Sequence, residues 1–129
     1  LASDSGVKIS LIIRGICCLY PQRKNLSENI KVISIIGHFL EHSRIFWFCN
    51  NGDNEVFIGS ADWMRRNLDR RIEAVTPIED YELKSKIYSL LQTYIKDDYF
   101  SWIMKEDGSY SKYKLDSSDN RSQIDLIEK

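Results

Sequence analysis

The sequence has few histidines and prolines, an odd number of cysteines, no long apolar run and almost no net charge. Its 129 residues include 2 His, 2 Pro and 3 Cys, and the formal net charge is -1. No apolar run approaches the ~20 residues that a membrane-spanning helix needs, and the first residues lack a signal-peptide pattern. The charge argues against a general nucleic-acid coat or an anionic-membrane binder, but it leaves room for a local basic pocket.

The cysteines do not follow a zinc-binding pattern. Cys17 and Cys18 are adjacent, whereas paired zinc ligands are usually separated by about two to four residues. We therefore expect these two and Cys49 to be reduced, buried small side chains, and we expect no metal site. Reduced thiols predict a reducing compartment, and we therefore expect a cytoplasmic location. Peripheral association of the protein with a membrane is an alternative within that location.

The length suits one domain with a real core. An apolar run starts almost at once, at 7–13, so we expect a piece cut from a longer protein. A domain over 1–114 and a polar tail over 115–129, frayed or helical, are predicted.

The apolar pattern predicts an α/β fold with one mixed sheet of about five strands flanked by helices. The first strand, a solid apolar run, should be buried on both faces. An Asn-Gly pair, Asn51-Gly52, predicts a hairpin between the third and fourth strands. The five expected strands are 7–13, 30–36, 44–49, 55–60 and 71–77.

Helical periodicity is clearest over 81–96, where apolar residues recur at three- and four-residue spacing and Asp80 is a suitable N-cap. Shorter helical pieces are expected at 37–42, about one turn, and within 61–69. Segments 100–105 and 109–114 could pair as a small hairpin.

Arg14 follows the first strand, and ligands of open α/β sheets bind beyond the carboxyl ends of strands. It is a candidate clamp for a phosphate or carboxylate, and a boundary salt bridge is the alternative. His42 and Arg44 are two residues apart along a strand, so their side chains point to the same side. Such a pair could transfer a proton or attack phosphorus while holding a phosphoryl oxygen. A solvated histidine is the plainer interpretation.

Four arginines lie within seven residues, at Arg65, Arg66, Arg70 and Arg71. Arginine suits bidentate phosphate contacts, although such a run is often only a solvated face. The hairpin should bring Gly59 and Ser60 beside His42. Taken together, these features predict a polyanionic phosphate ligand.

Three separated segments, in order, carry a resemblance to a known family. IRGICCLYP, LSENIKVISIIGHFLEHSRIFWF and IGSADWMRRNLDRRIEAVTPI closely resemble the C-terminal catalytic domain of the long polyphosphate kinases, from about Val7 to about Ile95. That domain is similar in fold to phospholipase D domains, which implies a phospholipase D-like single domain here. HSR then resembles a variant of the H-x-K motif, and GSAD resembles G-S-x-N.

The resemblance implies reversible transfer of the terminal phosphate of ATP to polyphosphate, with Mg²⁺ and a phosphohistidine. His42 matches the second catalytic histidine, an acid/base or assisting group, and Arg44 replaces the motif's lysine. His38 receives no role, and Arg65 stands where relatives often carry proline. The implied ATP- and phosphate-binding residues are Arg14, His42, Arg44, Ser60, Arg66, Arg70 and Arg71.

A double phospholipase D-like site needs one histidine from each of two similar domains, so this chain should be half of a site. The phosphorylated histidine and most Mg²⁺ ligands would lie on preceding domains of the same polypeptide. The implied partners are ATP or ADP, polyphosphate and further copies in a homo-oligomer, but no nucleic acid. The alternatives are half of a phosphodiesterase or nuclease, which predicts Lys and Asn where Arg44 and Asp62 stand, and a non-catalytic polyanion-binding module.

Overall fold

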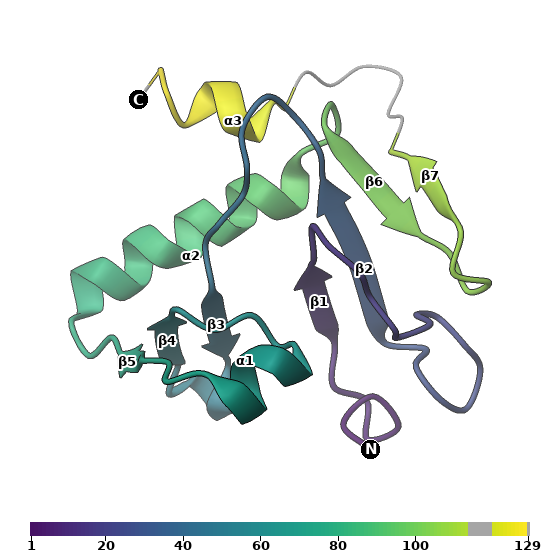
Figure 1. The fold of residues 1–129 in the computed structure, drawn as a ribbon, viewed down its shortest axis with the longest axis horizontal. Helices are drawn as coiled ribbons and strands as arrows, with labels where there is room; N and C mark the ends of the chain where they lie inside the picture. The colour runs from purple at the N-terminus through teal and green to yellow at the C-terminus, as the bar shows by residue number, and fades with distance from the viewer. Residues whose placement is uncertain (114–119, 129) are drawn as a thin grey trace. The chain divides into compact units, whose positions relative to one another are not determined.

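The computed structural model describes residues 1–113 and 120–128 and confirms the α/β class (Figure 1). The chain divides into two compact units. Unit 1 comprises Leu1–Glu41 and Leu91–Lys129, and unit 2 comprises His42–Leu90. The expected boundary between domain and tail, at 114/115, lies outside the described residues.

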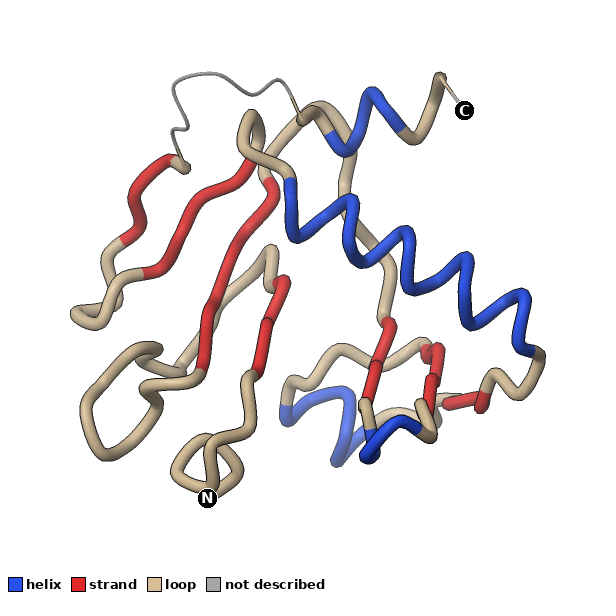
Figure 2. The backbone as a smooth tube through the Cα atoms, turned by 180° about the vertical axis from the view of Figure 1, so that it is seen from behind, coloured by secondary structure: helices blue, strands red, loops and turns tan. Residues whose placement is uncertain are grey.

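Unit 1 contains a four-stranded mixed sheet in the order β1-β2-β6-β7 (Figure 2). β1 runs parallel to β2, and the other neighbours are antiparallel, so the expected C-terminal hairpin is confirmed as β6 and β7. The strands are β1 (Ile9–Ile12), β2 (Ile30–Ile35), β6 (Ser101–Met104) and β7 (Tyr110–Lys112).

Burial in this sheet follows strand position rather than composition. The expectation that the first strand is buried on both faces is wrong, because β1 is an edge strand and its Ser10 is exposed. β2, which has a neighbour on each side, is the buried strand: Val32 is fully buried and Ile35 is 1% exposed. Ile30, Val32 and Met104 form the core cluster of this unit.

The C-terminal part of unit 1 is anchored by a buried carboxylate. Asp97 follows α2 (Tyr81–Lys96) and accepts hydrogen bonds from the Ser122 N–H at 2.8 Å, the Ser122 hydroxyl at 2.5 Å and the Phe100 N–H at 2.7 Å. Ser122 begins the short helix α3 (Ser122–Asp125). The sequence predicts a tail that is either frayed or helical, and it is helical over α3.

No helical turn forms over 37–42, so that prediction is wrong. The reason is a side chain far away in sequence. Gln123 Oε1 accepts the Phe39 N–H at 3.0 Å, and Gln123 Nε2 donates to the Phe39 carbonyl at 2.8 Å and to Glu41 Oε1 at 2.7 Å. These bonds satisfy backbone groups that a helical turn would otherwise satisfy.

Unit 2 contains a separate antiparallel sheet in the order β3-β4-β5, so the expectation of one five-stranded sheet is wrong. Its strands are β3 (Ile45–Phe48), β4 (Glu55–Gly59) and β5 (Val75–Pro77). The predicted Asn-Gly hairpin is confirmed and turns through the 3₁₀ element η1 (Asn50–Gly52), where Asn50 and Asn51 have φ of 37° and 53°. Asparagine tolerates this left-handed region better than most residues.

Two helices belong wholly or partly to unit 2. α1 (Arg65–Arg70) confirms the short helix expected within 61–69, and α2 begins in unit 2 and ends in unit 1. The bounds predicted for α2 are confirmed, as is its N-cap, because Asp80 Oδ1 accepts the Leu83 N–H at 2.8 Å. In the described part of the chain, no helix is long and apolar enough to cross a bilayer.

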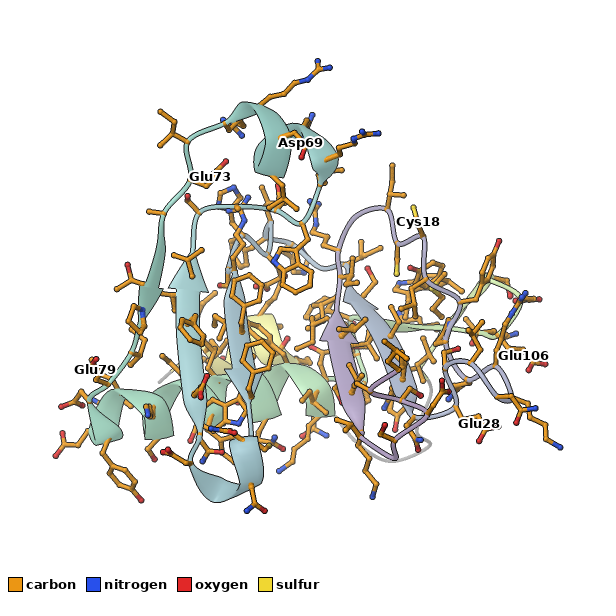
Figure 3. All side chains as sticks on the ribbon, turned by 90° about the horizontal axis from the view of Figure 1, so that it is seen from below. Cys18, Glu28, Asp69, Glu73, Glu79 and Glu106 are labelled. Carbon is orange, nitrogen blue, oxygen red and sulfur yellow. The ribbon has the colours of Figure 1, made fainter. Side chains whose placement is uncertain are left out.

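The three cysteines are free, but the expectation that they are buried is wrong. Cys17 is half-buried, whereas Cys18 and Cys49 are exposed. Both exposed residues lie beyond strand ends: Cys18 on the loop after β1 (Figure 3), and Cys49 directly before η1. Loops mostly run over the protein surface, and on the loop after β1 Cys17 packs against the core of unit 1, whereas its neighbour Cys18 points to solvent.

Candidate functional site

The β3–β4 pairing builds an open pocket in unit 2. Ile45 pairs with Ile58, and the Gly59 N–H donates to the Arg44 carbonyl at 3.0 Å. The segment before β3 therefore lies beside the end of β4, as the Asn-Gly hairpin predicts. The pocket has a volume of about 480 Å³ and is lined by His42, Ser43, Arg44, Ile45, Ile58, Gly59 and Ser60.

Arg44 is the most tightly held side chain of this pocket. Its Nε donates to Asp62 Oδ1 at 3.0 Å, and its Nη1 donates to the His42 carbonyl at 2.9 Å. The Arg44 side chain is only 17% exposed, against 44% for Asp62. The motif positions occupied by Arg44 and Asp62 are thus joined by an ion pair.

The Arg44 guanidinium also contacts the His42 ring. Nη1 lies 2.6 Å from Nδ1 and 3.1 Å from Nε2. Nη1 is thus within hydrogen-bonding distance of both ring nitrogens, and the tautomer decides which of them accepts. The contact holds the ring against Arg44, while His42 as a whole is exposed.

Asp62 is stabilised as a carboxylate. The hydrogen bond from Arg44 lowers the pKa of Asp62, with smaller contributions from the charges of Arg44 and His42 and from Asn67, while partial burial opposes them. Asn67, on α1, is 1% exposed, and its Nδ2 lies 3.4 Å from the Asp62 carbonyl. α1 is thereby tied to the strand end that carries Asp62.

The Ser60 hydroxyl is already hydrogen-bonded to other residues of the chain. Its hydroxyl donates to Glu73 Oε2 and accepts the Ala74 N–H at 3.0 Å. Arg71 is shared between Glu73, 3.7 Å from its Nε, and Asn67, 3.3 Å from its Nη1. Figure 3 labels Glu73 on the stretch between α1 and β5. A phosphate oxygen would have to displace Glu73 before it could accept a hydrogen bond from Ser60.

The arginines of α1 differ in whether their side chains form ion pairs. Arg65 pairs with Asp69, also labelled in Figure 3, at 3.0 Å, with both side chains exposed. Arg66 and Arg70 are exposed and lie four residues apart on α1, on one helical face. Within residues 1–113 and 120–128 neither has an ion pair. They are the cations of α1 that are free to meet a polyanion.

Two further predicted residues lie in unit 1. Arg14 is exposed and follows β1, as expected for a residue beyond a strand's carboxyl end, and its role stays a prediction. His38 contacts Phe100 edge-on, with ring centroids 5.6 Å apart, and has no apparent part in a site. The described residues hold no group of three or more His, Cys, Asp or Glu that could bind a metal ion.

Sequence reasoning missed two supporting residues, Asn67 and Glu73. Asn67 has a readable signal, since it stands four residues before Arg71 within a helical stretch, a spacing that brings two side chains together. Glu73 has none, because its bond to Ser60 depends on how β4 and β5 pair.

Comparison with known proteins gives consistent matches along the chain. A family model described as polyphosphate kinase C-terminal domain 2 matches residues 1–123. The chain is 57% identical over 128 residues to the polyphosphate kinase of Parasynechococcus marenigrum, with 98% of this chain and 18% of that protein covered. It is 45% identical over 130 residues to the polyphosphate kinase of Pseudomonas aeruginosa, with 99% of this chain and 19% of that protein covered.

A solved structure agrees. The crystal structure of polyphosphate kinase from Porphyromonas gingivalis matches with a TM-score of 0.91 at 41% identity, and the match covers 98% of this chain and 20% of that one. The chain thus spans about a fifth of the length of the relatives it matches.

Proposed function

Because this chain belongs to the polyphosphate kinase C-terminal domain 2 family, we propose that it is the part of a longer polyphosphate kinase that supplies one catalytic histidine and several phosphate-binding arginines. The longer protein transfers the terminal phosphate of ATP reversibly to polyphosphate, through a phosphohistidine on a preceding domain. The observation that carries the proposal is the pocket in which His42 meets Arg44 and the Gly59-Ser60 strand end.

In this proposal His42 is the proton-transferring or assisting group. Phosphoryl transfer needs in-line positioning and neutralisation of charge on the phosphoryl oxygens, and little covalent chemistry. An exposed imidazole whose ring is held by Arg44 can protonate or stabilise a departing oxygen. Arg66 and Arg70, which carry charge without titrating, support polyphosphate binding, with Arg71 at the edge of the same helix.

Other parts of the proposal concern partners. We assign Arg14 to the nucleotide or a phosphate, and we expect ATP or ADP, polyphosphate, the preceding domains and further copies of the polypeptide as partners. The described residues offer no carboxylate cluster for Mg²⁺, and we assign the ligands of that ion to the rest of the polypeptide. Three free cysteines are in keeping with a cytoplasmic location.

Substitution of His42 in the longer polypeptide tests the proposal. His42→Ala should lower the rate of polyphosphate synthesis by about 10²–10⁴-fold, the usual cost of losing a positioned acid or base, without unfolding the protein, because His42 is exposed. Initial rates of polyphosphate formation from ATP measure the effect. His38→Ala is the matched control, since it removes the other histidine. A His42→Ala enzyme as fast as the His38→Ala enzyme would remove His42 from the mechanism.

A further inference from the structure

The three contacts of Arg44 all serve to hold it in place. Its Nε is paired with Asp62, and its Nη1 donates to the backbone of His42 and contacts the imidazole nitrogens. A residue that clamps a phosphate uses a guanidinium fork that points at the ligand. Here the side chain is largely buried and two of its three nitrogens are committed to the chain itself.

The pair also cancels its own charge. Asp62 is an ionised partner at 3.0 Å, and it is itself held by the buried Asn67 of α1. Arg66 and Arg70, by contrast, are exposed and have no ion pair among the described residues. Unit 2 thus has exposed cations without an ion pair, Arg66 and Arg70, and it has Arg44, whose charge is neutralised by Asp62 beside the histidine.

We propose that Arg44, oriented by Asp62, is a positioning residue for His42 rather than the phosphate clamp that the lysine of an H-x-K motif would be. The contact of Nη1 with the ring nitrogens fixes the orientation of the imidazole, so that a ring nitrogen can meet the phosphoryl group in line. The inference rests on the proposed function of His42. It extends that function by giving Asp62 a role and by separating Arg44 from the residues that bind polyphosphate.

Kinetics of the longer polypeptide separate the two roles. A clamp stabilises bound substrate, so its loss raises KM, whereas misorientation of the acting group lowers kcat. We expect Asp62→Asn and Arg44→Lys each to lower kcat by about 10- to 100-fold, since a small misplacement of a reacting group costs up to about 100-fold. KM for polyphosphate should change less than about threefold. Arg66→Ala with Arg70→Ala should instead raise KM.

The chain offers a matched control and a coupling test. Asp69→Asn breaks another Arg–Asp pair with the same 3.0 Å separation, but an exposed one away from the pocket, and should leave kcat unchanged. In a His42→Ala background, Asp62→Asn should lower kcat no further, because residues that act as a unit are not additive.

Histidine NMR on the 129-residue chain gives a readout that does not depend on activity. With only two histidines, Asp62→Asn should shift the His42 ring signals as the Arg44 contact is lost, while the His38 signals stay in place and report an intact fold. A raised KM with unchanged kcat in Arg44→Lys, or unmoved His42 signals in Asp62→Asn, would overturn the inference. Full activity in His42→Ala would instead remove the proposed function itself.

Discussion

Gly37 lies against the buried side chain of Gln123. A Cβ added at Gly37 would overlap Gln123 Oε1, and it would lie 2.8 Å from Cδ of that residue and 3.0 Å from Phe100. Gln123 cannot easily give way, because its amide is bonded to the Phe39 backbone and to Glu41. At the scale of one residue, the path of the chain just before His42 therefore depends on the absence of a Cβ at Gly37.

Gly37→Ala should consequently lower the free energy of unfolding by about 1–3 kcal/mol, the usual cost of overpacking a filled site. Urea denaturation of the chain measures it. Gly15→Ala is the control, because a Cβ there meets nothing within 4 Å, and it should be neutral. Equal stability of the two variants would mean that Gln123 does not hold this segment in solution.

The first residue of α1 is not fixed by the geometry of the helix start. Arg65 is its first residue, and the preceding Met64 has φ -109° and ψ 140°, an extended conformation. That conformation suits a residue before proline, and proline is favoured at the first helical position, where its missing N–H is not needed. The proline that the family resemblance implies at this position is therefore compatible with the same helix start.

Arg65→Pro should change the free energy of unfolding by at most about 1 kcal/mol, because it loses only an exposed ion pair, and such pairs contribute about 0–1 kcal/mol. Leu68→Pro is the contrasting variant. It removes an N–H that donates to the Met64 carbonyl at 3.1 Å, and proline inside a helix costs about 3 kcal/mol or more. Thermal denaturation followed by circular dichroism compares them. A large loss in Arg65→Pro would contradict the assigned start of α1.

The whole molecule brings one histidine to its pocket. His42 lines it, and His38 contacts Phe100 in unit 1 instead. Under the proposed function, a second catalytic histidine would have to come from elsewhere in the longer polypeptide, whereas exposed arginines on α1 are present in the chain itself. We therefore expect the chain alone to bind polyphosphate without catalysing phosphoryl transfer.

We expect the 129-residue chain to bind long-chain polyphosphate, with an affinity that falls steeply as salt rises, by analogy with counterion release from nucleic acids, and to form no polyphosphate from ATP. Binding isotherms at several salt concentrations and a phosphotransfer assay check both. Removing Arg66 and Arg70 should weaken binding more than removing exposed Lys24 of unit 1. Turnover by the chain alone, abolished by His42→Ala, would contradict the half-site view.

Local features were predictable from the sequence, and features that depend on distant contacts were not. The bounds of α2, the Asn51-Gly52 hairpin and the meeting of His42 with Ser60 follow from periodicity and turn chemistry, which act over a few residues. The non-helical course of 37–41 depends on Gln123, 84 residues beyond Phe39. The division into two sheets depends on strand pairing, which alternation along a single strand does not encode.

The discontinuity of unit 1 has a consequence for the order in which the chain folds as it is synthesised. Unit 2 is continuous, and its hairpin and sheet can pair as soon as residues 42–90 have emerged. β2 pairs with β1 early, but its other edge waits for β6. Contacts between distant segments form slowly, and unpaired apolar edges invite aggregation. Ile30–Ile35 is therefore the segment most exposed to misassembly until β6 arrives.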